Sequence, residues 1–255
     1  MQITVRGSGP PLVMLHGWAM HGGIFEPLSA RLESSFTLHV VDLPGHGASA
    51  HSGVPLTLDA VARDVAARTP PAIWLGWSLG GLVALHAAQA IPASVRGLAM
   101  LCASPRFVRS ESWLQGMDAS VFTGFANDLA RDYRATIDRF LMLEAQGSDH
   151  VRDDIRLLRE QVFAIASPDP ARLVEGLALL QESDLCGGLP TLSMPSLWLA
   201  GRRDRLVSPA AMRAAAALAP GSHFVQFDHG GHAPFLSHAA DVASALLEFS
   251  ATLRA

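Results

Sequence analysis

The sequence predicts an α/β fold in which a mostly parallel β-sheet carries helices on both faces and is interrupted by a helical insertion. Short, almost wholly apolar runs alternate with stretches of helical periodicity; the alternation stops near residue 105 and resumes near residue 194. Strands that are apolar along their whole length are typical of parallel sheets buried on both faces. A chain of 255 residues is long enough to form such a domain.

The first part of the chain contains alternating strands and helices. The predicted strands are Pro11–His16, Phe36–Asp42, Ala72–Trp77 and Val95–Ala103, and the predicted helices are Thr57–Arg68 and Gly81–Ala90. Strands that alternate with helices favour βαβ connections, which pair neighbouring strands in parallel.

The middle of the chain has a different character. Residues 106–183 show helical spacing and many charges, with no good candidate for a strand. The earlier pattern then returns, with predicted strands Ser196–Gly201 and His223–Asp228 and predicted helices Pro209–Leu218 and Ala239–Leu253. We therefore expect a sheet domain made of residues 1–105 and 184–255, with residues 106–183 forming a helical cap or lid.

Composition excludes several classes of protein. Hydrophobic residues make up 49% of the chain and charged residues 16%, which is the reverse of a disordered sequence. The net charge is −4 and no basic block stands out, so we expect no nucleic-acid partner. Two cysteines, Cys102 and Cys186, form neither a disulfide framework nor a zinc site, and we expect no metal or cofactor.

The chain contains no apparent targeting segment. The first apolar run is only about five residues long, with no small-residue cleavage site after it. No stretch approaches the roughly 20 apolar residues that a membrane span requires. We expect a cytoplasmic monomer with no membrane association.

The segment Gly76-Trp77-Ser78-Leu79-Gly80 matches the pattern G-x-S-x-G. A predicted strand precedes the serine and a predicted helix follows it, as a nucleophile elbow requires. The helix would point its positively polarised N-terminus at the reaction centre. The sequence therefore predicts Ser78 as a nucleophile.

An oxyanion that forms at Ser78 needs two hydrogen-bond donors. One should be the backbone N–H of Leu79, the residue after the nucleophile, and the other should come from a loop after an early strand. His16-Gly17-Trp18 follows such a strand, so we predict the Trp18 N–H as the second donor. The alternative is that His16-Gly17 forms an ordinary turn.

A serine needs a neighbouring base, and in this type of fold the chain order is serine, acid, histidine. His232 lies in the loop Asp228–Phe235 after the last predicted strand, where a base could reach the serine. His229 is the rival, but it lies only one residue beyond the strand. We predict His232 as the general base.

The acid that orients the base should also lie at the end of a strand. Asp204 follows the strand Ser196–Gly201, at the edge of the sheet where such sites are assembled. A carboxylate there can hold the histidine tautomer and stabilise the imidazolium. We predict Asp204 as the acid, with Asp184 and Asp228 as weaker alternatives.

Five segments together resemble the α/β-hydrolase superfamily over nearly the whole chain. They are HGW at 16–18, DLPGHGAS at 42–49, GWSLGG at 76–81, GRRDRLV at 201–207 and GGHAPF at 230–235. Longer segments (LHGWAM, FTLHVVDLPGHG, AIWLGWSLGGLVA, HAPFLSH and RFLMLE at 139–144) are similar to the BioH family of pimeloyl-[acyl-carrier protein] methyl ester esterases. The resemblance implies an α/β-hydrolase fold and a serine carboxylesterase of biotin biosynthesis.

The resemblance also implies a substrate and a site for it. The substrate would be the methyl ester of a pimeloyl chain carried as a thioester on acyl carrier protein. By similarity, the substrate site would include Trp18, Ser78, Leu79, His232 and the segment Phe140, Leu141, Met142, Leu143 and Glu144. An apolar slot for the chain could come from Trp18, Trp77, Phe122, Phe125 and Phe140. The alternative is that the phenylalanines only pack the core of the insertion.

A carrier protein is acidic, so basic residues should receive it. Arg152, Arg156 and Arg159 share one face of a predicted helix, and Arg139 lies in the preceding helical segment. Arg139, Arg152 and Arg156 match basic positions of the family, whereas another such position is Ala135 here, beside Arg134. The alternative is a solvated face on which the arginines pair with nearby acids, namely Asp149, Asp153, Asp154 and Glu160.

Two other functions remain open on the sequence. One is a generalist carboxylesterase that acts on short free esters. The other is a binding protein that uses a hydrolase scaffold without catalysis, because fold alone does not determine function. The complete set of predicted nucleophile, base and acid favours an enzyme.

Overall fold

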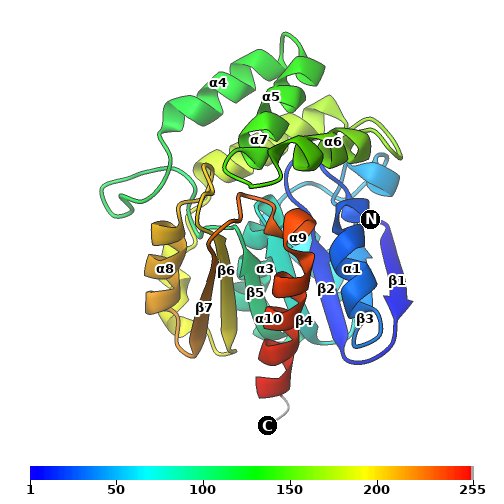
Figure 1. The fold of residues 1–255 in the computed structure, drawn as a ribbon, viewed down its shortest axis with the longest axis vertical. Helices are drawn as coiled ribbons and strands as arrows, with labels where there is room; N and C mark the ends of the chain where they lie inside the picture. Colours follow the sequence, from blue (N-terminus) through cyan, green and yellow to red (C-terminus); the bar gives the residue numbers. More distant parts are fainter. Residues whose placement is uncertain (254–255) are drawn as a thin grey trace.

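A computed structural model describes residues 1–253 and contains one seven-stranded sheet in the order β1-β3-β2-β4-β5-β6-β7 (Figure 1). All neighbouring strands are parallel except β1, which is antiparallel to β3. The strands are β1 (Ile3–Gly7), β2 (Pro11–Leu15), β3 (Thr37–Val41), β4 (Ala72–Trp77), β5 (Val95–Leu101), β6 (Ser196–Gly201) and β7 (Ser222–Phe227). The fold class predicted from the sequence is confirmed.

The helices fall into a core set and a cap set. The core helices are α1 (Glu26–Leu32), α2 (Leu58–Ala66), α3 (Leu79–Ala90), α8 (Pro209–Leu218), α9 (Pro234–Ser237) and α10 (Ala239–Thr252). The cap helices are α4 (Ala119–Leu129), α5 (Tyr133–Ala145), α6 (Val151–Val162) and α7 (Pro170–Glu182). Short 3₁₀ helices are η1 (Gly22–Phe25), η2 (Gly47–Ser49), η3 (Pro92–Ser94) and η4 (Cys186–Thr191).

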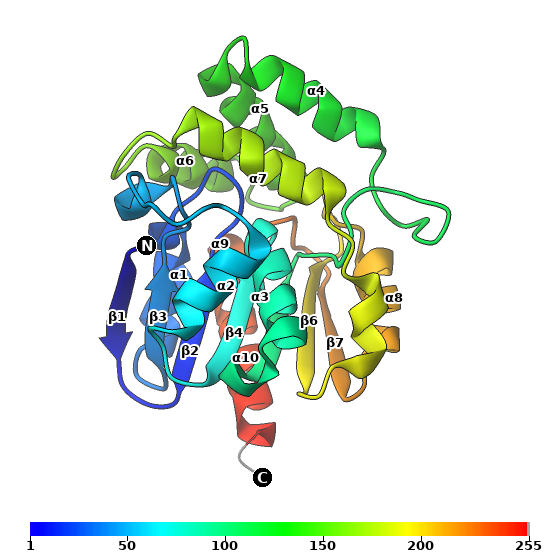
Figure 2. The ribbon, with the colours of Figure 1, turned by 180° about the vertical axis from the view of Figure 1, so that it is seen from behind.

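The central strands are buried on both sides. Helices α1 and α10 cover one face of the sheet, and α2, α3 and α8 cover the other (Figures 1 and 2). Every residue of β4 and of β6 is buried as a result. This two-sided burial explains why these strands are apolar along their whole length.

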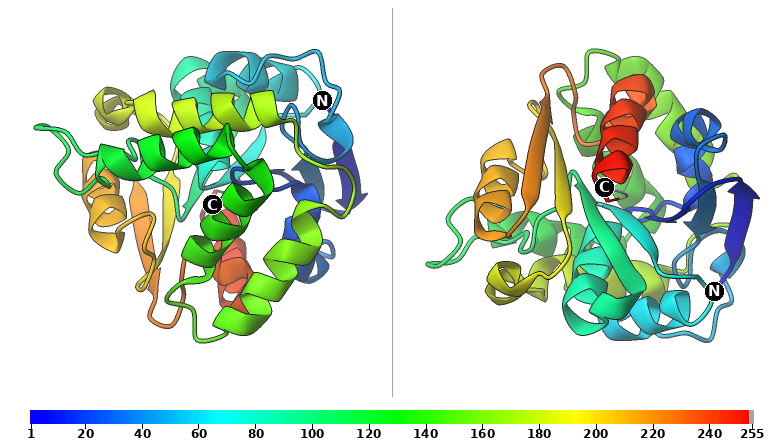
Figure 3. Two further views of the ribbon diagram at one scale, coloured as in Figure 1. Left: turned by 90° about the horizontal axis from the view of Figure 1, so that it is seen from above. Right: turned by 90° about the horizontal axis from the view of Figure 1, so that it is seen from below.

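The cap lies over the carboxyl ends of the parallel strands (Figures 1 and 3). Three of its four helices begin at aspartate caps: the side chains of Asp118, Asp132 and Asp169 each accept a backbone N–H in the first turn of α4, α5 and α7. Such caps satisfy amides that have no partner within the helix. The residue at which each of these three helices begins is therefore determined by the local sequence.

The predicted strands and helices of the core all form, and their ends differ by at most two residues. Strand β1 and helices α1 and α9 were not predicted. In β1 the side chains are mostly exposed, with Val5 at 56%, so it lacks the apolar run that marks the buried strands. No helix within residues 1–253 has the length and apolar character needed to cross a membrane.

Candidate active site

Ser78 lies in a sharp turn between β4 and α3, with backbone angles of φ 53° and ψ −118°. This conformation is strained for a residue with a side chain. The turn is possible because its neighbours are glycines: a Cβ on Gly76 would lie 2.3 Å from the carbonyl oxygen of Gly80, and one on Gly80 would lie 2.2 Å from that of Leu15. The strand–turn–helix context is the one expected of a nucleophile elbow.

Two unpaired amides lie around Ser78. Leu79 is the first residue of α3, so its N–H has no partner within the helix. Gly17 passes close to the nucleophile, since a Cβ placed on it would lie 3.2 Å from the Ser78 Cβ, and Trp18 follows directly. Neither the Leu79 nor the Trp18 amide donates to another atom of residues 1–253. Both remain available for an oxyanion.

His16 supports the loop that carries Trp18. Its Nδ1 donates to the carbonyl oxygen of Gly17 at 2.8 Å, and its Nε2 accepts the Leu43 N–H at 2.9 Å. Burial, reinforced by the nearby His46, lowers the pKa of His16 well below its ordinary value. His16 therefore stays neutral and connects the predicted oxyanion loop to the end of β3.

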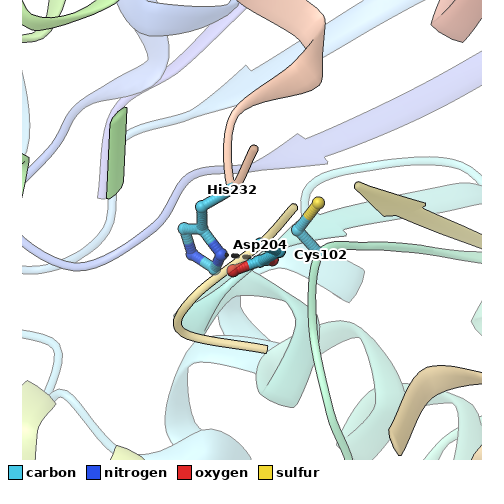
Figure 4. Close-up of side chains that lie close together, drawn as sticks. All are labelled: Cys102, Asp204 and His232. Carbon is cyan, nitrogen blue, oxygen red and sulfur yellow. Dashed lines mark hydrogen bonds and ion pairs between the residues drawn. The ribbon is translucent and has the colours of Figure 1, made fainter. Parts of the chain in front are cut away.

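Asp204 and His232 form a buried pair at the ends of neighbouring strands (Figure 4). Asp204 Oδ2 lies 2.8 Å from His232 Nδ1, and both side chains are fully buried. The other oxygen, Oδ1, accepts the backbone N–H groups of Leu206 and Val207 at 2.8 and 2.9 Å. The carboxylate is therefore fixed in orientation and holds one tautomer of the histidine.

The second nitrogen of His232 is free. Its Nε2 is buried and has no hydrogen-bond partner among the described residues. The Ser78 hydroxyl likewise makes no hydrogen bond within that part of the chain, so the serine–histidine contact is not formed in this state. In enzymes without substrate, such contacts are often long and tighten when substrate binds. The unpaired Nε2 is the atom that a general base needs.

Trp77, the last residue of β4, is bonded to the loop that carries His232. Its indole Nε1 donates to the carbonyl oxygen of His232 at 2.8 Å, and its ring packs against Phe235 with 4.9 Å between centroids. Since Trp77 directly precedes Ser78, this bond connects the loop that carries His232 to the turn that carries Ser78. We predicted Trp77 as part of a substrate slot, whereas its position favours a role in holding His232.

The rival acids and base lie outside this cluster. His229 is 62% exposed at the side chain and contacts Asp149 on the cap. Asp184 pairs with Arg106, and Asp228, at 69% side-chain exposure, lies near Arg202. The structure brings together Asp204 and His232 and none of these alternatives.

Cys102 is a neighbour of the pair that the sequence reasoning missed. Its sulfur lies within 4.8 Å of ligand atoms of both Asp204 and His232 (Figure 4). Burial, followed by the charge of Asp204, raises the pKa of the thiol well above its usual value. Asp204 and His232 bind each other directly, as an acid that orients a base would. The position of Cys102 just after β5, next to β6, was the available signal.

Aromatic side chains from the core and cap form an apolar wall. The ring of Phe140 packs edge-on against Trp18 at 4.7 Å and against Phe125 at 5.4 Å. The Trp18 indole also donates to the Leu173 carbonyl on α7, at 2.8 Å. Phe122 lies apart from this wall and packs on Phe107. Trp18, Phe125 and Phe140 are therefore the predicted slot residues that the structure brings together.

The predicted segment from Phe140 to Glu144 divides between two faces of α5. Phe140, Leu141 and Glu144 are buried, whereas Met142 is 42% exposed. Met142 and Leu143 instead line a groove of about 460 Å³ on the cap, together with Arg139, Gln146, Gly147 and Val151. Only part of the segment can face Asp204 and His232.

Glu144 is a fully buried carboxyl group whose two oxygens have no partner among the described residues. Burial, and secondly the charge of Asp204, raises the pKa of Glu144 well above its ordinary value. Its backbone carbonyl accepts the His232 N–H at 3.3 Å, so the residue is anchored beside the base. Burial without a partner therefore favours the neutral form of Glu144.

Replacing this acid should change how stability depends on pH. The folded protein keeps the Glu144 proton at pH values where the unfolded chain has lost it, so the free energy of unfolding falls as pH rises above the ordinary glutamic-acid pKa. Glu144→Gln removes this loss; the variant's Tm should match wild type at about pH 4 and exceed it increasingly toward about pH 8. Each kcal/mol moves Tm by about 2–4 °C in a chain of this size.

Thermal unfolding of both proteins across this pH range tests the expectation. Glu160→Gln is the control, because Glu160 is exposed on α6 and should give a difference that is independent of pH. A constant difference between Glu144→Gln and wild type would contradict a raised pKa.

The predicted docking arginines lie on the cap, and most are paired with acids. Arg139 binds Asp128 at 2.8 Å, and Arg156 binds Asp153 at 3.2 Å. Arg159 makes two bonds to Asp138, at 2.5 and 2.9 Å. Arg152 is exposed and has no ion pair among residues 1–253. Of the acids expected to neutralise this face, only Asp153 binds one of these four arginines.

The comparisons with known proteins agree with this architecture. Residues 10–239 match the family described as "alpha/beta hydrolase fold". An esterase from Exiguobacterium antarcticum superposes with a TM-score of 0.86 at 23% identity, covering 99% of this chain and 95% of that one. At this identity the likeness concerns the fold alone.

Relatives with similar sequences identify a group within this family. The pimeloyl-[acyl-carrier protein] methyl ester esterase of Stenotrophomonas maltophilia (strain K279a) is 56% identical over 253 residues, which cover 99% of this chain and 97% of the relative. The protein of that name from Xanthomonas oryzae pv. oryzae (strain MAFF 311018) is 53% identical, over 99% of this chain and all of the relative. The chain therefore belongs to the α/β-hydrolase family and, within it, to the pimeloyl-[acyl-carrier protein] methyl ester esterases.

Proposed function

We propose that this chain hydrolyses the methyl ester of pimeloyl-[acyl-carrier protein], releasing methanol and pimeloyl-[acyl-carrier protein], in biotin biosynthesis. The observation that carries the proposal is the buried Asp204–His232 pair with an unpaired Nε2, in a chain 56% identical to a curated esterase of that substrate. The expectation of a cytoplasmic monomer stays a prediction.

The reaction proceeds through an acyl-enzyme at Ser78. The Ser78 oxygen attacks the ester carbonyl while His232 Nε2 takes its proton, and the Leu79 and Trp18 amides stabilise the oxyanion. The imidazolium, stabilised by Asp204, then protonates the departing methoxide to give methanol. Water enters, loses a proton to His232, attacks the acyl carbon, and the Ser78 oxygen leaves with that proton.

The proposed substrate matches the surroundings of the pair. The aromatic wall of Trp18, Phe125 and Phe140 is apolar, and we expect the methylene chain to bind against it. The arginines of the cap offer positive charge to an acidic carrier. Their present ion pairs are largely exposed, and such pairs contribute only about 0–1 kcal/mol, so an acidic partner can replace them at little cost.

The decisive experiment compares carrier-bound and free methyl pimelate. Mass spectrometry of the carrier conjugate should show loss of the methyl ester with wild-type protein and none with Ser78→Ala. The ratio kcat/KM should favour the carrier-bound form, more strongly at low salt than at high salt. Equal rates on both forms would indicate a generalist carboxylesterase, and no burst with a chromogenic ester would indicate a protein that only binds.

Arg152→Glu should slow only the carrier-bound reaction. Arg152 has no ion pair in the described part of the chain, so reversing its charge removes steering and adds repulsion. The ratio kcat/KM should fall about 3- to 30-fold at low salt and less at high salt. Rates on free methyl pimelate should not change. Arg96→Glu is the control, because Arg96 is exposed on β5, away from the cap. An equal effect of both variants would argue against docking at α6.

A further inference from the structure

The connection between α5 and α6, residues 146–150, lies against both loops that carry the catalytic pair; we call it the α5–α6 junction. Gly147 has φ 94°, and a Cβ on it would lie 2.3 Å from the carbonyl oxygen of Arg203, the residue before Asp204. A Cβ on Gly231, the residue before His232, would lie 3.2 Å from the Gln146 carbonyl oxygen. This part of the cap thus touches the residues that immediately precede the acid and the base.

Asp149 makes the polar contacts of the junction. Its carboxylate pairs with the Arg203 guanidinium through Oδ1 and with His229 Nδ1 through Oδ2, at 2.8 Å for the latter. Arg203 also contacts His229 Nδ1 at 3.3 Å. One cap residue therefore holds a residue from each catalytic loop.

The core loops do not depend on Asp149 for their own structure. The Arg203 N–H donates to the Gly230 carbonyl at 3.0 Å, which joins the two loops directly. The cap is also attached elsewhere, because Trp18 bonds to Leu173 on α7 and His21 Nε2 bonds to the Gln161 carbonyl on α6. Removing the Asp149 carboxylate should therefore release the junction alone, not the catalytic pair or the whole cap.

We propose that Asp149 is a positioning residue for substrate. By binding Arg203 and His229 it holds the C-terminal part of α5, including Phe140 and Glu144, over the catalytic pair. Phe140 belongs to the aromatic wall against which the proposed acyl chain would bind, so Asp149 sets how well the site accepts long chains. The inference rests on the proposed esterase function and adds a determinant of chain-length preference to it.

Asp149→Asn tests the inference with two chromogenic esters, p-nitrophenyl acetate and p-nitrophenyl hexanoate. The KM for hexanoate should rise about three- to fivefold, as expected from an ion-pair cluster that is partly exposed. The KM for acetate and kcat for both esters should stay within about twofold, because the catalytic pair keeps its own bonds.

Asp228→Asn is the matched control. Asp228 directly precedes His229, but it pairs with Arg202 within the core and does not touch the cap junction. Asp228→Asn should leave KM and kcat unchanged for both esters. The single variants Asp149→Asn and Arg203→Gln remove the same contact. The double variant should therefore raise the hexanoate KM no more than the single variant with the larger effect.

Hydrogen exchange provides a readout that does not require turnover. Amides near the end of α5 should exchange faster in Asp149→Asn than in wild type. In Asp228→Asn their exchange rates should equal those of wild type. Unaltered exchange, or equal effects on both esters, would overturn the inference. If wild-type protein cleaved neither ester, the proposed function would fail while hydrogen exchange still decided the role of Asp149.

Discussion

Ser78→Ala should lower kcat on any ester substrate by on the order of 10⁵- to 10⁶-fold. The substitution removes only the hydroxyl group, and without it no acyl-enzyme can form. Catalysis would be limited to direct attack by water, aided by the Leu79 and Trp18 amides, which by themselves leave a residual acceleration of about 10³–10⁴ over water. A chromogenic ester followed in steady state and in the burst phase measures the loss.

The structure predicts that this loss is not caused by unfolding. The Ser78 hydroxyl makes no hydrogen bond within residues 1–253, and alanine keeps the Cβ and hence the same backbone strain at φ 53°. Wild type and variant should therefore unfold at nearly the same temperature. A folded variant that kept more than about 1% of the wild-type kcat would contradict a serine mechanism.

The sequence was informative where burial or chemistry leaves a local pattern. Strands β4 and β6 are buried on both faces, so each had to be apolar throughout, and their bounds were predicted to the residue. The carboxyl ends of parallel strands meet at one edge, which is why Ser78, Asp204 and His232 were predicted as a set from their places after strands. Of this set, the structure joins Asp204 to His232 directly.

Features that depend on contacts between distant segments could not be read in this way. The buried position of Glu144 follows from how α5 packs against the His232 loop, and no local pattern distinguishes it from an exposed helical glutamate. The acids that pair with the cap arginines were mostly mispredicted for the same reason: Asp138 reaches Arg159 from another helix, and Asp149 pairs with the core instead. The bond from the Trp77 indole to the His232 carbonyl also joins segments that are far apart in the chain, so no local pattern indicates it.

Asp204→Asn should lower kcat by about 10⁴-fold, and the geometry of Asp204 explains why. Oδ1 accepts two backbone N–H groups, from Leu206 and Val207, so the amide oxygen of an asparagine must take that position. The amide NH₂ group then faces His232 Nδ1 and can only donate to it. His232 would have to carry its proton on Nε2, where it could no longer accept one from Ser78.

The alternative amide orientation is worse, because it would point NH₂ at two N–H donors inside a fully buried site. The backbone N–H groups of Leu206 and Val207 thus determine the orientation of the asparagine amide, and this orientation determines the tautomer of His232. Asp228→Asn, which alters an exposed acid close to the same loop, should leave kcat unchanged. If Asp204→Asn were folded, as judged by thermal unfolding, and still turned over at close to the wild-type rate, the orienting acid would have to be another residue, and the buried pair seen here would have no part in the chemistry.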